Sequence, residues 1–161
     1  MTTLIETLAG VPAGSKLSAA LKTRAEVMRL SEAAHDAVLV PREPGGLSHA
    51  LRAALAARMC RHVGNDAAAA HYDVYLAHSE DADVAVLAQP GGTCGEPRQD
   101  AMARHADLLT LAPRKATKGD IEALRAVGIS EPDIVRLSEL AAFVNYQLRV
   151  IAGLKLLKDV Q

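Results

Sequence analysis

The sequence predicts an all-α protein, a single bundle of six or seven helices, and three observations support this. Half of the residues are hydrophobic but only 2% are aromatic, so Ala and Leu must fill the core, which favours close helix-on-helix packing. Apolar residues recur at spacings of three and four, the period of an amphipathic helix. Strand-like alternation is lacking, with residues 84–88 the one ambiguous run. The length of 161 residues fits one domain, taken as residues 1–161.

Two helices are expected in the first forty residues. Residues 2–9 are predicted to form a short helix that Gly10 ends. Ser15 is predicted to cap a longer helix that runs to about Leu39 with a loose apolar stripe. Pro41 then begins a loop rich in Pro and Gly.

The centre of the chain predicts two helices joined by a tight turn. Ser48 is a favoured N-cap for the first of them. Gly64 is suited to end it, because glycine adopts a left-handed backbone without strain. Asn65 then caps a helix through His78, with Asp66 at its positive N-terminal end. The predicted buried face of the first helix consists of Leu51, Ala54, Leu55, Met59, His62 and Val63, with Arg52, Arg58 and Arg61 mostly elsewhere.

The next segment is punctuated by glycine and proline. Residues 79–89 are compatible with a short helix, and residues 89–99 form a Gly/Pro loop that we expect to be the most mobile part of the chain. Pro97 suits the first turn of a helix that continues to Pro113.

Two helices are predicted to complete the chain. Thr117 and Asp120 have the spacing of a capping box, with Asp in place of the usual Glu or Gln, and the helix that they begin ends at Gly128. Ser130 is predicted to cap a long last helix. Its apolar positions follow the helical period at Ile134, Leu137, Ala141, Val144, Leu148 and Ile151.

Charge and composition limit the functional classes. A net charge of −1 argues against a nucleic-acid surface as the main partner. The first fifteen residues contain Glu6 and no Lys or Arg, so no secretory signal is expected, and no run approaches the roughly 18 apolar residues of a membrane span. We therefore expect a cytoplasmic protein with no membrane partner and with both cysteines reduced.

Two stretches carry a resemblance to a known family. Residues 47–72 read LSHALRAALAARMCRHVGNDAAAAHY, and residues 106–154 contain a Pro-terminated helix, the short helix DIEALRAVGIS and the long helix AFVNYQLRVIAGL in that order. Residues 47–78 and 106–154 together resemble the alkylhydroperoxidase D / carboxymuconolactone decarboxylase superfamily, and in particular its peroxidase-related branch. The resemblance implies an all-helical fold and a homo-oligomer, which is a dimer, trimer or hexamer in the superfamily.

The redox chemistry of that family does not transfer to this sequence. Redox-active members carry CxxC at the start of the helix after the glycine turn, a His one turn later and a Glu on the preceding helix. One thiolate attacks the peroxide, the second resolves the sulfenic acid, and His and Glu relay the proton. Here residues 64–68 read GNDAA, without sulfur, and no acidic residue lies between Glu43 and Asp66. Only His71, or Tyr72 beside it, falls near the position of the family's His.

The remaining polar residues supply candidate catalytic and ligand-binding groups. His71 is the first catalytic candidate, with Tyr72 and His62 as companions; each is also compatible with a structural role in a helix interface. The ligand-binding candidates are Asn65, Tyr75 and Arg149. A guanidinium such as that of Arg149 can bind a carboxylate bidentately, but a hydrogen bond between helices or subunits is the simpler role and the one that we favour.

The two cysteines are weak redox candidates. Cys60 lies in the middle of a predicted helix, and Cys94 lies in the Gly-rich loop, with no partner at CxxC spacing. A buried cysteine usually acts as a small hydrophobic side chain. No pair of histidines has the spacing of zinc ligands with an acidic neighbour, so neither a metal nor another cofactor is predicted.

Two functions of different classes are consistent with this sequence. The first is a non-redox relative of the peroxidases that binds a small organic ligand or pairs with a thiol-bearing relative. The second is an enzyme of decarboxylase, isomerase or atypical peroxidase type that uses His71 with Tyr72 or His62, since decarboxylase members of the superfamily work without the dithiol. Under the second hypothesis, His71 lines a pocket with another polar group at about 3 Å.

Overall fold

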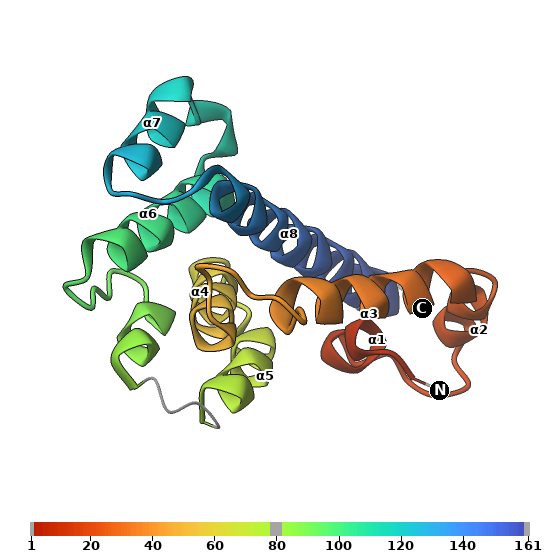
Figure 1. The fold of residues 1–161 in the computed structure, drawn as a ribbon. Helices are drawn as coiled ribbons and strands as arrows, with labels where there is room; N and C mark the ends of the chain where they lie inside the picture. The colour runs from red at the N-terminus through yellow and green to blue at the C-terminus, as the bar shows by residue number, and fades with distance from the viewer. Residues whose placement is uncertain (1, 78–81, 160–161) are drawn as a thin grey trace.

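The computed structural model describes residues 2–77 and 82–159, and these fold as eight α-helices with two short 3₁₀ segments and no strand. The all-α class predicted from the sequence is confirmed (Figure 1). The helices are α1 (Leu4–Ala9), α2 (Lys16–Lys22), α3 (Ala25–Leu39), α4 (His49–His62), α5 (Asp66–Ala77), α6 (Pro97–Leu111), α7 (Lys118–Ala126) and α8 (Glu131–Asp159), and the 3₁₀ segments are η1 (Ala82–Ala88) and η2 (Pro113–Lys115).

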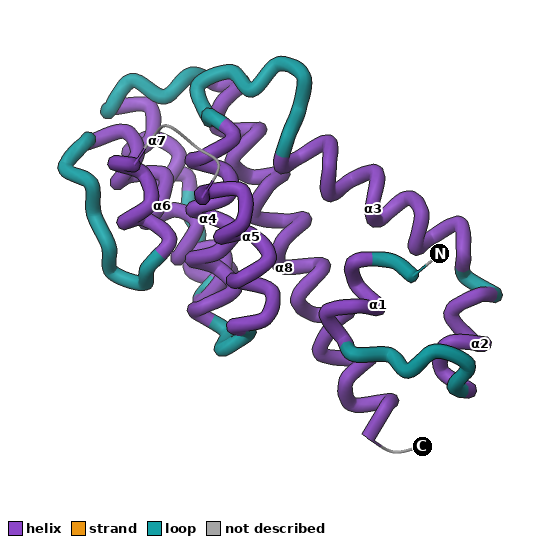
Figure 2. The backbone as a smooth tube through the Cα atoms, turned by 90° about the horizontal axis from the view of Figure 1, so that it is seen from below, coloured by secondary structure: helices purple, strands orange, loops and turns teal. Residues whose placement is uncertain are grey.

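The long helix α8 connects the two ends of the molecule. It starts beside α6 and α7 and runs to α1 and α2, with α3 alongside it (Figures 1 and 2). Helix α4 lies at the centre and packs against α5, η1, α6, α8 and α3. Every residue from 50 to 60 is buried as a result. The many alanines of α4 allow its neighbours to approach closely, as the composition predicts.

Two hydrophobic clusters hold the helices together. The larger one surrounds α4 and includes side chains of α5, η1, α6 and the first two-thirds of α8. The smaller one fastens α1, α2 and the start of α3 to the last part of α8, and it consists of Ile5, Ala9, Leu17, Met28, Ile151 and Leu154. The N-terminal helices therefore have a small core of their own.

The predicted helix from Ser15 to Leu39 is wrong as a single element, because it breaks between α2 and α3. The N–H groups of Thr23 and Arg24 donate to Ala20 O and Leu21 O, which are three residues back rather than four. The Thr23 hydroxyl also donates to Ala20 O at 2.7 Å, so a local side-chain bond competes with the helical pattern. This break accounts for eight helices where six or seven were predicted.

Most predicted helix ends are observed. Ser48 Oγ accepts from Leu51 N–H at 3.1 Å, and Gly64 follows α4 with a φ of +69°. Thr117 donates to the Asp120 carboxylate from both its N–H and its hydroxyl. Of the segment predicted at 79–89, residues 79–81 lie outside the described residues, as does His78, and Ala82–Ala88 is 3₁₀.

The predicted faces of α4 need correction. Arg52 and Arg58 were expected away from the buried face, but they are 2% and 3% exposed, and Val63 was expected inside but is 49% exposed. Arg52 donates to Leu47 O, Val38 O and Pro44 O at 2.8–3.0 Å, so it ties the loop before α4 to that helix. Hydrogen bonds to backbone carbonyls make the burial of this guanidinium possible.

Helix α8 is long and contains a markedly apolar stretch. Among the described residues it is the one helix long and apolar enough to span a membrane by length and composition, and half of its most apolar window is buried inside the fold. The central helix of a water-soluble protein meets the same criteria.

Candidate functional site

The turn at Gly64 contains no reactive group. Asn65 Oδ1 accepts from Ala68 N–H at 3.2 Å, so Asn65 caps α5 as predicted and its carboxamide oxygen is used within the helix. Ala68 and Ala69 of the first turn are buried in the main core. Methyl groups therefore occupy the start of α5, and no thiol lies there.

The two cysteines are both free thiols. Cys60 is fully buried in α4, and burial raises the pKa of its thiol to about 12. Cys94 is half-buried, and its Sγ lies 3.2 Å from Gln99 Oε1 and 3.5 Å from Asp100 Oδ1. Burial raises the pKa of Cys94 as well, and so does the Asp100 carboxylate. Neither thiol has the electropositive surroundings that favour a nucleophilic thiolate.

The structure gives Tyr72 a structural position. Its ring is 1% exposed, and its hydroxyl donates to Gln147 Oε1 on α8 at 2.6 Å. Burial raises the pKa of Tyr72. Tyr72 thus joins α5 to α8 inside the core, and none of the described pockets includes it.

His62 is held in a closed polar cluster, which we call the Arg58 cluster (Arg58, His62 and Asp107). His62 Nε2 lies 2.7 Å from Asp107 Oδ1, and Arg58 binds both oxygens of the same carboxylate at 2.6 and 2.7 Å. Arg58 also donates to three backbone carbonyls, Leu87 O, Gln89 O and Gly92 O. The cluster joins α4 and α6 to η1 and to the segment after it, so we assign His62 a structural role.

His71 does line a pocket. Its Nε2 lies 3.2 Å from Nε2 of His35 on α3, and His35 Nδ1 lies 3.0 Å from Asp36 Oδ1. Both rings border a pocket of about 250 Å³ that Leu4, Glu32 and Asp36 complete. Burial lowers the pKa of His71, and the neighbouring His35 lowers it further. We call this arrangement the histidine pair.

Tyr75 lies next to the histidine pair rather than in a pocket of its own. Its ring centroid is 5.6 Å from that of His71 and 6.3 Å from that of His35. Burial raises the pKa of Tyr75, and the Asp36 carboxylate contributes in the same direction. The aromatic ring shields one side of the two imidazoles.

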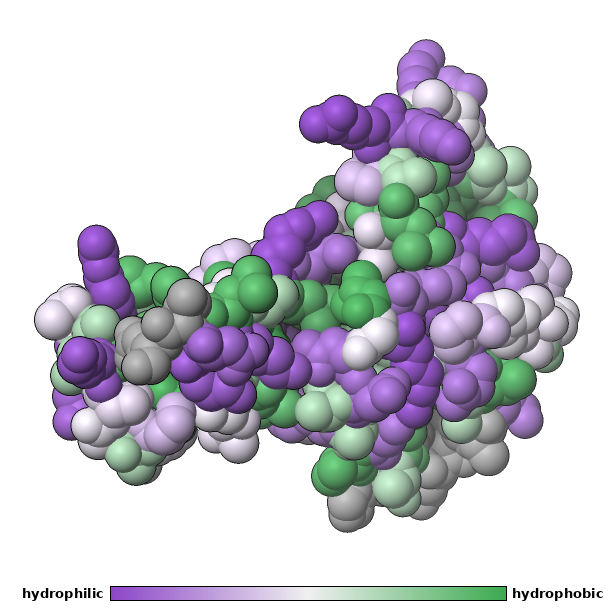
Figure 3. Space-filling model, turned by 180° about the vertical axis from the view of Figure 1, so that it is seen from behind, coloured by the Kyte–Doolittle hydropathy of each residue, from purple (hydrophilic) through white to green (hydrophobic). Residues whose placement is uncertain are grey.

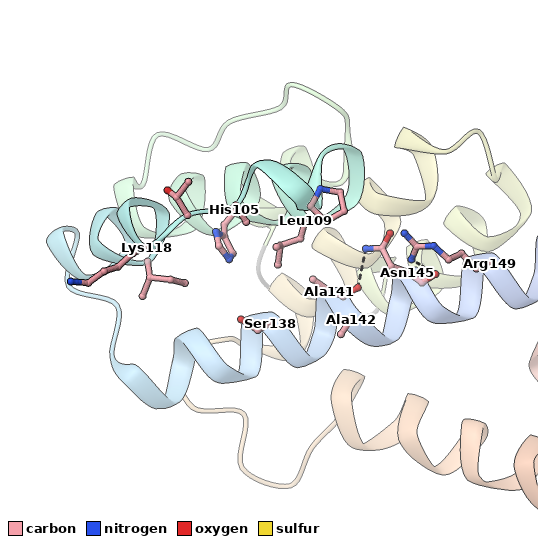
Figure 4. A pocket seen from close by; sticks show the side chains of 12 residues that line it. His105, Leu109, Lys118, Ser138, Ala141, Ala142, Asn145 and Arg149 are labelled. Carbon is pink, nitrogen blue, oxygen red and sulfur yellow. Dashed lines mark hydrogen bonds between the residues drawn. The ribbon is translucent and has the colours of Figure 1, made fainter.

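A larger cavity, of about 640 Å³, lies between α6, α7 and α8. His105 and Leu109 reach into it from α6, and Asn145 and Arg149 from α8 (Figure 4). Lys118 stands at the end opposite Arg149 (Figure 4). From behind, the surface is hollowed below the lobe that α7 forms, and apolar surface gathers there (Figure 3). Most of the remaining wall is apolar, from Pro113, Ala116, Ile121, Ala141 and Ala142.

The polar groups of this cavity have different roles. Asn145 Nδ2 donates to Ala141 O at 2.9 Å and to Thr110 Oγ1 on α6 at 3.2 Å, so it joins α8 to α6. Arg149 is exposed, and its Nη1 donates to Asn145 O at 3.1 Å. A guanidinium has five N–H donors, so this single bond leaves capacity for a ligand. Burial lowers the pKa of His105, against the opposing effect of Asp120.

Several groups at these sites are absent from the candidates predicted from the sequence. His35 is 36 residues from His71, and Asp107 is 49 from Arg58, so no local motif indicates either contact. One weak signal exists. Glu32 and His35 are three residues apart on α3, which places them on the same face of the helix.

Comparison with solved structures identifies the fold. An uncharacterized peroxidase-related protein from Silicibacter sp. TM1040 matches 80% of this chain and 68% of its own, with a TM-score of 0.70 and 19% identity. A second uncharacterized peroxidase-related protein, an alkylhydroperoxidase AhpD core from Ralstonia eutropha JMP134, matches 83% and 71% of the two chains, with a TM-score of 0.61 and 26% identity. No family model and no curated protein matches the chain.

These similarities define the structural class of the protein. The chain has the helical fold of peroxidase-related proteins with an alkylhydroperoxidase D core. The resemblance to the alkylhydroperoxidase D / carboxymuconolactone decarboxylase superfamily, drawn from residues 47–78 and 106–154, is thereby confirmed.

Proposed function

We propose that this chain is a non-redox relative of the peroxidase-related proteins that binds a small apolar organic acid between α6, α7 and α8. The observation that carries the proposal is the composition of the 640 Å³ cavity, which combines a mainly apolar wall with the Arg149 guanidinium at one end. Ligand pockets of about 300–1,000 Å³ with apolar walls and a few polar groups are typical of small-molecule sites.

The non-redox part of the proposal follows from the thiols. Cys60 is fully buried with a pKa of about 12, Cys94 lies beside carboxyl and carboxamide oxygens, and the two form no disulfide. A peroxidatic cysteine needs an accessible thiolate and a second thiol close by. Pairing with a thiol-bearing relative, and assembly as a homo-oligomer, stay predictions.

The charge in the cavity favours an acid over a neutral ligand. Arg149 and Lys118 are the two ionised side chains on its wall, and both are cationic. A charge-assisted hydrogen bond to a carboxylate contributes about 1.5–3 kcal/mol, which corresponds to roughly a tenfold to hundredfold gain in affinity. A short aryl or alkyl carboxylate therefore matches both the wall and the guanidinium.

The test is calorimetric titration with phenylbutyrate and with its uncharged amide, which has the same shape. We expect the acid to bind at least about tenfold more tightly, and Arg149→Gln to remove that preference. Arg42→Gln, which removes an exposed guanidinium from the loop before α4, is the matched control and should change nothing. Equal affinity for acid and amide, or an Arg149→Gln variant that keeps the preference, contradicts the proposal.

One observation favours the enzyme hypothesis as a second candidate. His71 lines a pocket and has a second polar group, His35 Nε2, at 3.2 Å, close to the separation expected for proton transfer. Tyr72 and His62 do not share this hydrogen bond, because the Tyr72 hydroxyl bonds Gln147 and His62 bonds Asp107. The Tyr72 ring does pack against both imidazoles, at centroid distances of 5.1 Å from His71 and 5.9 Å from His35. Turnover of peroxide that survives Cys60→Ala and Cys94→Ala but disappears in His71→Ala supports the enzyme and contradicts the non-redox proposal.

A further inference from the structure

We infer that His35 and His71 form the preformed half of a binding site for a divalent transition-metal ion of the Zn²⁺ type, which Glu32 and water complete. This inference concerns a site separate from the cavity of α6, α7 and α8, and it does not depend on the ligand proposed there. The sequence alone predicts no metal, because the two histidines are 36 residues apart and come from different helices.

The first argument is the spacing of the two nitrogens. Zn–N bonds of about 2.0–2.1 Å place two nitrogens of a tetrahedral site about 3.3–3.4 Å apart. The His35 and His71 Nε2 atoms are 3.2 Å apart. The pair thus needs to open by only a few tenths of an ångström to hold an ion between its ring nitrogens.

The second argument is the orientation of His35. The Asp36 carboxylate can only accept, so His35 carries its proton on Nδ1, at 3.0 Å from Asp36 Oδ1, and presents a lone pair at Nε2. A carboxylate behind a histidine is the usual support of a metal ligand, because it fixes the tautomer and raises basicity. His71 now donates its Nε2 proton to that lone pair. A cation takes the place of this proton once His71 carries its hydrogen on Nδ1.

The third argument is the chemistry of the pocket. Its polar wall consists of the two imidazoles and the carboxyl groups of Glu32 and Asp36, with no Lys or Arg among the lining residues. Carboxylates and imidazoles together favour a small cation. The cavity of α6, α7 and α8 has the opposite character, since Lys118 and Arg149 are its ionised groups. The two pockets thus select ligands of opposite charge.

Glu32 supplies the third ligand after a local rearrangement. It lies one turn before His35 on the same face of α3 and borders the same pocket, but its Oε1 now accepts from Leu4 N–H at 2.6 Å. No group of three metal-binding side chains already converges among the described residues. When Glu32 releases the first N–H of α1, two histidines, one glutamate and a water give the ligand set of open zinc sites.

The Arg58 cluster lacks this capacity. Asp107 faces His62, but the Arg58 guanidinium binds both oxygens of that carboxylate, so a cation would have to displace a buried positive charge. The histidine pair has no such competitor.

The test is titration of untagged, chelator-treated protein with Co²⁺, followed by its visible absorption, and then displacement by Zn²⁺. We expect one ion per chain, with the absorption of nitrogen-coordinated Co²⁺. Asp36→Asn, which removes the carboxylate behind His35, should weaken binding about 10- to 100-fold, and His71→Ala and Glu32→Gln should each weaken it further than that. His49→Ala is the control, because His49 is exposed and bonds Pro41 O.

A measurement on the unaltered protein guards against variants that fail to fold. In ¹⁵N spectra of the imidazoles, Zn²⁺ should shift Nε2 of His35 and His71 and leave His105 unchanged. Binding that is the same in His71→Ala as in the wild type, or shifts at other histidines only, would overturn the inference. If Glu32→Gln binds Co²⁺ as tightly as the wild type, Glu32 is not a ligand and the three-ligand form of the site is overturned.

Discussion

The Arg58 cluster and the histidine pair both place an imidazole beside a carboxylate, but they differ in what surrounds them. In the first, Asp107 receives bonds from Arg58 and lies against His62, and Arg58 also binds three backbone carbonyls. In the second, the imidazoles border a pocket, and no cation lines it. A polar side chain whose hydrogen bonds are all made within the protein therefore has a structural role, whereas one that borders a pocket with few partners is available to a ligand.

The largest loss of stability is expected from a substitution that breaks the Arg58 cluster. Arg58→Ala leaves the Asp107 carboxylate and several carbonyls without their donor, and removal of one member of a buried ion pair costs about 3–5 kcal/mol. Denaturant unfolding measures the loss. The control is Arg29→Ala, whose ion pair with Glu26 is exposed to solvent and should contribute little to stability. Similar losses in both variants would mean that the Arg58 cluster is not a structural tie.

A smaller effect is expected at Tyr72, which shares α5 with His71 but has its hydroxyl fully engaged. Tyr72→Phe leaves Gln147 Oε1 buried without its donor, at a cost of about 1–3 kcal/mol. Tyr146→Phe removes the bond to Ser31 Oγ at a half-exposed site and should cost less. Calorimetric melting compares the two variants. Cobalt binding by Tyr72→Phe should equal that of the wild type, and a loss of binding would place Tyr72 at the site.

His105 is a buried histidine whose protonation should be visible in the stability of the fold. Burial lowers its pKa, and the opposing influence of Asp120 does not compensate; Lys118 and Arg149 border the same cavity. The unfolded chain takes up the proton near pH 6.5, before the folded chain does. Stability is therefore complete above about pH 6.5 and falls as the pH decreases toward the lower folded pKa.

The His105→Gln variant isolates this contribution. As the pH falls from 8 to 5, the melting temperature of the wild type should decrease more than that of the variant. A difference that is constant over this range would show that His105 takes up its proton equally in the folded and unfolded chains.

The smallest effects are expected at the thiols. Cys94→Ser should change the free energy of unfolding by no more than about 0.5 kcal/mol, because the side chain is half-buried in a loop. A thiol reagent should modify Cys94 and not Cys60 in the folded protein, since Cys60 is fully buried. Mass spectrometry distinguishes the two sites. A disulfide between them, or rapid modification of Cys60, would restore the redox hypothesis.

The sequence predicts helices and their ends well, because these depend on neighbours along the chain. The cap at Ser48, the turn at Gly64 and the box at Thr117 each involve residues at most a few positions apart. The break at Thr23 is not predicted, because the apolar stripe continues across it and the bonds of Thr23 and Arg24 to carbonyls three residues back leave no clear signal in the sequence.

The sites are less predictable, because long-range polar contacts determine them. A charged residue is placed on the surface by default, so the burial of Arg52 and Arg58 was not foreseen. The sequence indicates His71 but not its partner His35, since only a side-chain contact between α3 and α5 brings the two imidazoles together. Arg149 was identified, whereas the cavity around it arises from three separate helices.

The separate core of the N-terminal helices has a kinetic consequence for the histidine pair. Leu4 of α1 forms part of the pocket wall, and α1 is held to α8 through the small cluster that contains Ile5 and Leu154. A unit with few buried contacts opens locally at lower free energy than the main core. The residence time of a bound ion would then depend on how often α1 lifts from α8, so weakening a distant leucine contact should hasten release even if the ligands are untouched.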